Sequence, residues 1–125
     1  QFALSVVKTL HDHGAGLLLG TDSFVVVPGF SSLQELEFFV RAGLRPYEAL
    51  RTGTINAAKA LHAEAEFGTV DVGKRADLLL LEANPLSDIG NISQRAGVML
   101  RGRWLAETEL RERLAEIERR VAQSQ

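Results

Sequence analysis

The sequence has no cysteine, which excludes a disulfide-stabilised scaffold and any metal site built from thiolates. It also lacks an apolar run near the roughly 20 residues that a membrane-spanning helix needs, and no signal peptide is visible. We therefore expect a cytoplasmic protein with no membrane partner. An excess of positive charge is missing too, because 14 Lys and Arg stand against 16 Asp and Glu, for a net charge of −2. Nucleic-acid-binding domains are usually basic, so we expect no nucleic-acid partner.

The 125 residues are 46% hydrophobic, which excludes extended disorder and suits one domain or part of a larger one. In the first half, apolar residues at helical spacing alternate with glycine breaks. Ser32, followed three residues later by Glu35, has the spacing of a capping box and predicts the start of a helix. The elements expected here are a helix over 2–13 that Gly14 ends, a strand over 15–19, a loop over 24–31, and helices over 32–42, 46–52 and 56–62.

The second half begins near residue 67, where turn residues recur at short intervals. The apolar run over 76–82 has the length of a strand, and Asn84-Pro85 closes it with a turn. Apolar stretches on either side of Arg101-Gly102-Arg103 predict a hairpin. The order of elements therefore changes from helices in the first half to strands in the second.

The tail over 107–123 predicts an amphipathic helix, because its apolar residues recur at helical spacing among Glu and Arg. We expect one packed apolar stripe on this helix, made by Leu110, Leu114, Ile117 and Val121. Aromatic side chains carry much of the buried area of a protein, so we also expect core positions for Phe38, Phe39 and Trp104.

Only one strand candidate, residues 15–19, falls in the first 66 residues. A short apolar run without alternation is typical of a strand that is covered on both faces in a parallel sheet. A single strand forms no sheet, so this one needs partners. We therefore expect that the chain is incomplete or assembles with another polypeptide.

Asp22 is the strongest candidate for chemistry, because it comes directly after this strand. In α/β folds, active sites lie at the carboxyl ends of the parallel strands. A carboxylate there can ligate a divalent metal or act as a general base on metal-bound water. The local pattern leaves open the alternative that Asp22 caps a loop by accepting backbone N–H groups.

Two histidines, His11 and His13, have a spacing that would suit a zinc site on a strand. The residues before them are helical in pattern, and positions two apart on a helix diverge by about 200°. We therefore predict that both lie at a solvated helix end, where histidine interacts favourably with the helix dipole. His62, at the end of another predicted helix, receives the same interpretation.

A series of short motifs runs along nearly the whole chain. They are Leu19-Gly20-Thr21-Asp22-Ser23, Pro28-Gly29-Phe30-Ser31, Gln34-Glu35-Leu36, Ala42-Gly43-Leu44, Pro46-Tyr47-Glu48-Ala49-Leu50, Thr54-Ile55-Asn56-Ala57-Ala58, Gly68-Thr69-Val70, Gly73-Lys74-Arg75-Ala76-Asp77-Leu78, Asn84-Pro85-Leu86-Ser87-Asp88-Ile89 and Leu100-Arg101-Gly102. Each motif alone is weak, but their order and spacing are specific. Together they resemble the end of the metal-dependent amidohydrolase superfamily, in its imidazolonepropionase-like and prolidase-like branch.

The resemblance implies an α/β fold, namely the C-terminal part of a (β/α)8 barrel with strands of a small β-sandwich that both chain ends build. Residues 1–66 would supply the eighth barrel strand and the helices that follow it. Residues 67–106 would form part of the sandwich, and residues 107–125 the C-terminal amphipathic helix. A whole barrel runs to about 250 residues, so much of it would lie outside this chain.

The resemblance also implies hydrolysis of amide bonds, including those of dipeptides, by metal-activated water. Asp22 matches the family's aspartate at the end of strand eight, which binds metal and shuttles a proton from the attacking water to the leaving group. It is therefore the one residue expected here in both the catalytic and the metal-binding role. In the complete enzyme we expect one or two divalent metals, zinc by preference, whose histidine ligands precede this segment.

A hydrolytic zinc site needs about three protein ligands and a water molecule. Asp22 alone would hold zinc weakly, so we expect the isolated chain to be inactive and to bind no metal. Its partners would be a small amide or dipeptide substrate in the complete enzyme, and the remainder of the barrel or other copies of the chain. The alternative is a non-catalytic assembly or interaction module that has kept elements of the fold.

Overall fold

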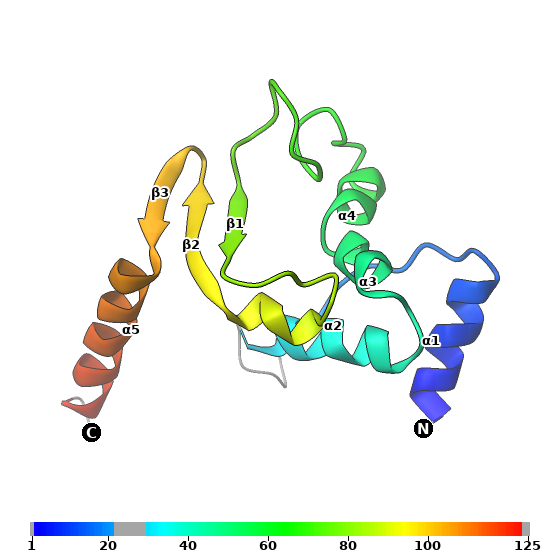
Figure 1. Cartoon of the computed structure of the whole chain (residues 1–125), viewed down its shortest axis with the longest axis horizontal. Helices are drawn as coiled ribbons and strands as arrows, with labels where there is room; N and C mark the ends of the chain where they lie inside the picture. The colour runs from blue at the N-terminus through cyan, green and yellow to red at the C-terminus, as the bar shows by residue number, and fades with distance from the viewer. Residues whose placement is uncertain (1, 22–29, 124–125) are drawn as a thin grey trace.

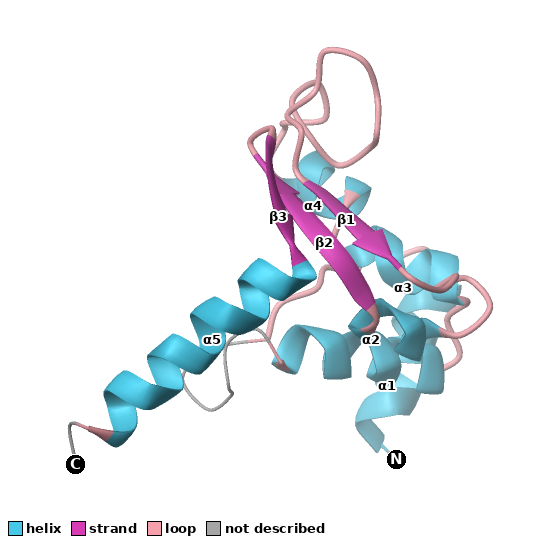
Figure 2. Cartoon of the chain, turned by 60° about the vertical axis from the view of Figure 1, so that its left-hand side comes forward, coloured by secondary structure: helices cyan, strands magenta, loops and turns pink. Residues whose placement is uncertain are grey.

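The computed structural model describes residues 2–21 and 30–123. Helices occupy the first half of the chain and an antiparallel sheet the second, so the fold is α/β (Figure 1). Figure 2 shows that the last helix projects from the sheet, away from the other helices. The elements are α1 (Phe2–Asp12), α2 (Ser31–Arg41), α3 (Pro46–Thr52), α4 (Ile55–Ala60), β1 (Leu78–Leu81), the 3-10 helix η1 (Ile89–Ser93), β2 (Arg95–Leu100), β3 (Arg103–Ala106) and α5 (Glu107–Ala122).

Glycine ends two of these helices, as the sequence predicted. Gly14 after α1 and Gly43 after α2 have φ angles of +78° and +107°, in the left-handed region that glycine adopts without steric cost. The next residue in each case donates its N–H back across the turn, from Ala15 to the Leu10 carbonyl oxygen at 2.9 Å and from Leu44 to that of Phe39 at 3.1 Å. This bond pattern is the Schellman motif, which satisfies carbonyl groups at a helix end.

The predicted capping box at Ser32 is wrong. Helix α2 begins at Ser31, and its N-cap residue Phe30 provides no side-chain cap. The Glu35 carboxylate accepts a hydrogen bond from the distant Gly20 N–H instead. The Glu35 carboxylate, which the local pattern predicted to cap the helix, therefore binds a backbone N–H from a distant part of the sequence.

Helix α4 is also shorter than predicted, since it ends at Ala60 rather than His62. His62 itself has a φ angle of +54°, which no helical residue adopts, so the chain turns away at this point.

A small hydrophobic core joins α2 and α3 to η1, which the sequence did not predict. The side chain of Asp88 caps η1 by accepting the Gly90 N–H at 2.9 Å, and Ile89 and Ile92 of η1 pack against the helices. The buried members of the core are Leu36, Phe39, Ala42, Leu44, Ala49, Ile89 and Ile92. Partly buried side chains of α1 and of the segment after it, including Leu4, Val7, Leu17 and Leu19, pack against them.

The three strands pair antiparallel in the order β1-β2-β3, and the predicted hairpin between β2 and β3 is confirmed. Arg101 and Gly102 form its two-residue turn with φ angles of +49° and +81°. Positive φ at both positions is the signature of a type I′ turn, whose twist matches that of the flanking strands. The Asp77 carboxylate fastens the turn to the chain before β1 by accepting the Arg101 N–H at 2.7 Å.

The sheet is largely uncovered within the described part of the chain. Successive strand residues point to opposite faces, yet the consecutive leucines Leu79 and Leu80 of β1 are both exposed, Leu80 by 54%. Trp104 on the edge strand β3 is 44% exposed, so its predicted core position is wrong. An aromatic side chain is buried only where another layer covers it. Of the two predicted core phenylalanines, Phe39 is buried and Phe38, about 100° further round α2, is exposed.

Helix α5 confirms the predicted tail helix, but of its predicted apolar stripe only Leu110 is partly buried. Leu114, Ile117 and Val121 are each at least half exposed, and none of the helix's described residues is buried. The helix is held at its first turn, where the Glu107 carboxylate pairs with Arg95 of β2 at 3.1 Å, and from there it points away from the sheet. None of the described helices has the length and apolar composition needed to cross a bilayer.

The predicted strand over 15–19 does not form in this chain. The residues belong to no sheet among those described, and Leu18 is 47% exposed rather than buried. The physical reason is that a strand needs a neighbouring strand to pair with, and the described residues place none beside it.

Candidate functional site

The candidate catalytic residue Asp22 lies outside the described residues. The structure does describe the segment that leads directly to it, residues 15–21, which runs from the end of α1 across the face of α3 and α4 (Figure 1). The contacts of this segment therefore define how the chain approaches the candidate site.

Beyond the turn that ends α1, three hydrogen bonds join the segment to later helices, one bond to each helix. The Asn56 side-chain amide of α4 donates to the Leu17 carbonyl oxygen at 3.1 Å. The Leu19 N–H donates to the carbonyl oxygen of Thr52, the last residue of α3, at 3.2 Å. The Gly20 N–H donates to Oε1 of Glu35 on α2, also at 3.2 Å. The next three helices in sequence, α2, α3 and α4, thus fix its backbone.

The sequence did not predict these contacts, although Asn56 and Glu35 are both unusual enough in their sequence context to suggest a specific role. Asn56 is a poor helix former within an alanine-rich helix, and such a residue often serves a specific hydrogen bond. Glu35 was assigned to a local cap because the pattern around Ser32 matched one. Nothing in the sequence indicates the backbone carbonyl of Thr52 as an acceptor.

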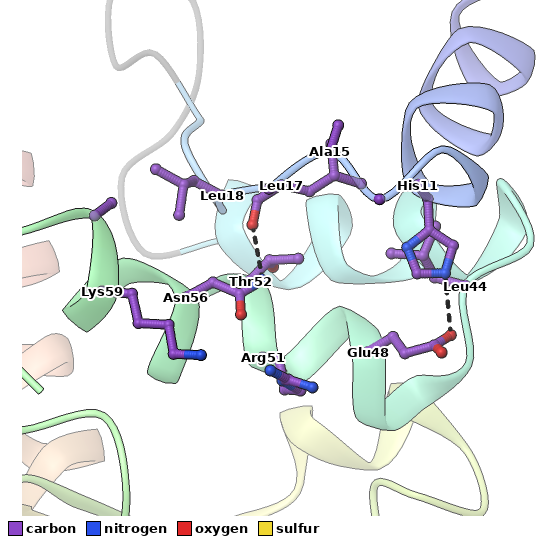
Figure 3. Close-up of a pocket in the computed structure, with 13 residues that line it drawn as sticks. His11, Ala15, Leu17, Leu18, Leu44, Glu48, Arg51, Thr52, Asn56 and Lys59 are labelled. Carbon is purple, nitrogen blue, oxygen red and sulfur yellow. Dashed lines mark hydrogen bonds and ion pairs between the residues drawn. The ribbon is translucent and has the colours of Figure 1, made fainter.

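A hollow of about 570 Å³ lies between this segment and the helices α3 and α4 (Figure 3). The end of α1 and residues 14–18 form one wall, and α3 and α4 form the opposite wall. Its lining combines glycine, alanine and leucine residues with several polar side chains. The polar side chains are His11, Glu48, Arg51, Thr52, Asn56 and Lys59.

Within the hollow, the strongest electrostatic feature is Glu48 near the start of α3. It accepts hydrogen bonds from the Arg45 guanidinium at 2.6 Å and from the Arg45 backbone N–H at 2.8 Å. These bonds, with a smaller contribution from nearby His11, lower the pKa of Glu48 to about 2. A carboxylate with so low a pKa is ionised at neutral pH and is unsuited to act as a general base.

The histidines of the His11-x-His13 pair have separate partners. His11 Nε2 lies 3.5 Å from Glu48 Oε2 and the ring is only partly exposed, so it belongs to the hollow rather than to a solvated helix end. His13 is exposed, and its Nδ1 lies 2.8 Å from the Thr9 carbonyl oxygen. The two rings therefore do not converge on one point.

Metal binding requires several ligands close together. Across residues 2–21 and 30–123, no three His, Cys, Asp or Glu side chains cluster in a way that could hold a metal ion. The His11–Glu48 pair supplies two groups, one of which already carries an ion pair with Arg45. The described residues alone therefore do not fit a metal centre, and the hollow offers hydrogen-bonding groups together with the charged side chains of Glu48, Arg51 and Lys59.

Comparison with known proteins assigns the chain to a family. The sequence model described as the Amidohydrolase family matches residues 3–105. This range contains the segment that leads to Asp22 and all of the three-stranded sheet except the last residue of β3, and it excludes α5.

Two curated relatives illustrate the similarity. The chain is 40% identical over 78 residues to ochratoxinase of Aspergillus niger, which covers 61% of this chain and 16% of that protein. It is 35% identical over 91 residues to imidazolonepropionase of Sphingopyxis alaskensis, which covers 69% of this chain and 22% of that protein. The chain therefore spans less than a quarter of the length of either relative.

Solved structures agree in fold. A Xaa-Pro dipeptidase with methionine bound in its active site superposes with a TM-score of 0.77 at 26% identity, over 82% of this chain and 25% of that one. Molinate hydrolase superposes with a TM-score of 0.68 at 30% identity, over 79% of this chain and 25% of that one. About four fifths of this chain thus superposes on one part of each of these larger proteins.

Proposed function

Because this chain belongs to the amidohydrolase family, as its sequence resemblance predicted, we propose that it is the C-terminal portion of a metal-dependent amidohydrolase that cleaves amide bonds. The names of its relatives indicate the substrate class. An imidazolonepropionase suggests a cyclic amide, and a Xaa-Pro dipeptidase suggests a dipeptide. The substrate of the complete enzyme is therefore a small amide or dipeptide.

In this proposal residues 1–66 form the end of a (β/α)8 barrel, and residues 15–19 are its eighth strand. Residues 67–106 form part of a small β-sandwich, and residues 107–125 are a C-terminal helix. The unburied leucines of β1 support this division, because a strand exposed on both faces needs further layers to cover it.

One observation carries the proposal: the segment that leads to Asp22 is fixed on one side and open on the other. Helices α2, α3 and α4 hold Leu17, Leu19 and Gly20 by the three hydrogen bonds described above. Leu18 remains 47% exposed, and no strand lies beside the segment among the described residues. This is the arrangement expected of a barrel strand whose helices are present and whose neighbouring strands belong to another part of the protein.

Asp22 is the catalytic residue that this proposal assigns to the chain. A carboxylate at the carboxyl end of a barrel strand is placed to accept a proton from the attacking water and to donate it to the departing nitrogen. Family membership implies a divalent metal, and zinc is the metal we propose. Since the described residues do not form a metal centre by themselves, Asp22 would share the metal with ligands from the rest of the protein, and the isolated chain is inactive.

The test uses the complete protein that contains this chain and its Asp22→Asn variant. Hydrolysis of a Xaa-Pro dipeptide and of imidazolonepropionate is followed with saturating zinc. We expect Asp22→Asn to lower turnover by about 10²- to 10⁴-fold, the usual contribution of a positioned acid–base group, with an unchanged melting temperature. Asp71→Asn, at an exposed loop aspartate, is the matched control and should retain turnover. Turnover retained by Asp22→Asn would remove Asp22 from the mechanism.

The coding sequence upstream of Gln1 gives a second check. An in-frame His-x-His motif after an apolar strand is expected if the chain completes a barrel. Its absence would contradict the proposal and favour a non-catalytic module.

A further inference from the structure

We propose that Glu35 is a positioning residue, which holds the backbone just before Asp22 and so fixes the approach of the catalytic carboxylate; this inference rests on the function proposed above. Glu35 lies on α2, fifteen residues beyond its partner Gly20 in sequence. Its Oε1 accepts the Gly20 N–H at 3.2 Å. A charged acceptor makes this bond stronger than an ordinary bond between neutral groups.

The surroundings of Glu35 show that its carboxylate is not placed there for packing. Its second oxygen, Oε2, is buried and has no hydrogen-bond partner among the described residues. The side chain borders a mainly apolar hollow of about 450 Å³ with Leu4, Val7 and Phe39. An apolar residue would stabilise this position better, because a buried carboxylate oxygen without a donor is costly.

Helix α2 itself has no need of a glutamate at this position. Its contact with the core is made by the buried residues Leu36 and Phe39. Glu37, two residues further on, is exposed to solvent and shows that acidic residues on this helix do not otherwise reach the segment. The feature that distinguishes Glu35 is its bond to Gly20.

Of the three bonds, the one between Glu35 and Gly20 lies nearest to Asp22 in sequence, so it restricts the position of Asp22 most. Asn56 and Thr52 fix Leu17 and Leu19, further from the catalytic position, whereas Glu35 fixes Gly20. Only two peptide units separate Gly20 from Asp22, so covalent geometry keeps their Cα atoms within about 7 Å of each other. Fixing the Gly20 amide therefore restricts the positions that the Asp22 carboxylate can reach. A misplacement of about 1 Å at a reacting group can cost about 10²-fold in rate.

The first arm of the test measures the bond directly in the 125-residue chain, by amide hydrogen exchange of Gly20 resolved by NMR. Removal of a charged acceptor should accelerate exchange about ten- to hundredfold in Glu35→Ala. Glu35→Gln keeps an acceptor oxygen, so its Gly20 exchange rate should lie between that of Glu35→Ala and that of the wild type. Glu37→Ala is the matched control and should exchange as the wild type does. Unchanged exchange in Glu35→Ala would overturn the inference.

The second arm measures kcat and KM of the complete enzyme, per folded molecule. We expect Glu35→Ala to lower kcat about 10²-fold with KM within about twofold of the wild type, and Glu35→Gln to recover a large part of the loss. A merely structural role would reduce the amount of folded enzyme and leave kcat per folded molecule unchanged, which would overturn the inference. If the wild-type protein splits no amide, the proposed function fails, and the exchange arm still decides whether Glu35 holds Gly20.

Discussion

Replacement of Gly97 by alanine should destabilise the small sheet, because this position in the central strand β2 has no room for a side chain. A Cβ atom built on Gly97 would lie 2.3 Å from Cζ2 and 2.5 Å from Cη2 of Trp104, and 2.8 Å from the Leu105 carbonyl oxygen. All three distances are far inside van der Waals contact. The indole can swing outward, since Trp104 is 44% exposed, but the carbonyl oxygen belongs to the paired backbone of β3. We expect Gly97→Ala to cost about 1–3 kcal/mol, as overpacking of a well-packed site does.

Urea unfolding of the 125-residue chain measures this loss, and Trp104, the single tryptophan of the sequence, reports it by fluorescence. A stability within about 0.5 kcal/mol of the wild type would refute the reasoning. A double-mutant cycle with Trp104→Leu, followed by circular dichroism, identifies the cause. Because the indole supplies two of the three contacts, Gly97→Ala should cost about 1 kcal/mol less in the Trp104→Leu background. An equal cost in both backgrounds would show that the ring is not the obstacle.

Three further outcomes follow from the described contacts. Asn56→Ala removes the donor to the Leu17 carbonyl oxygen and should cost about 1 kcal/mol in urea unfolding, whereas Asn56→Ser would retain part of the bond. Glu48 has a native pKa of about 2, below its ordinary value of 4.5, so its contribution is complete above pH 4.5 and is lost as the pH falls through about 2. The stability gap between wild type and Glu48→Gln should therefore shrink between pH 5 and pH 2, and a constant gap would contradict the ion pair with Arg45. Gly68→Ala places a Cβ 2.7 Å from that of Ala58 at a φ of +98°, and should lower the melting temperature more than an alanine at Gly16, which meets nothing within 4 Å.

Local features of the fold could be predicted because their causes are local. Gly14 and Gly43 end helices through their own backbone freedom, and Arg101-Gly102 forms a hairpin turn because the flanking strands are close in sequence. The heptad-like spacing of α5 likewise predicts a helix, but not what covers it, and its apolar stripe is exposed in this chain.

Features that depend on distant residues were not predictable from local patterns. Glu35 satisfies the capping-box pattern but binds Gly20, because a backbone donor fifteen residues away competes for the same carboxylate. The strand expected over 15–19 has the right composition, but the residues that the structure describes bring no neighbouring strand to pair with it. Trp104 was expected in the core by residue type, although burial depends on a covering layer that the described residues do not provide. In each case the tertiary context decided the outcome.

In the candidate site, too, some features could be predicted from the sequence and others depend on contacts between distant residues. The resemblance of short motifs to the amidohydrolase family was confirmed by the family match over residues 3–105, and it led to Asp22 from sequence alone. Asp22 lies outside the described residues, so its catalytic role stays a prediction. The three hydrogen bonds that fix the segment before it became visible only in the structure.

Metal analysis of two purified samples, the 125-residue chain and the complete protein that contains it, tests the central claim most directly. Both are dialysed against the same zinc-containing buffer, and bound metal is counted per folded polypeptide. Since a hydrolytic site takes about three protein ligands, we expect one or two tightly bound ions in the complete protein and no stoichiometric metal in the chain alone. One tightly held zinc ion per monomer of the isolated chain would contradict the account, because the ligands would then lie within these 125 residues.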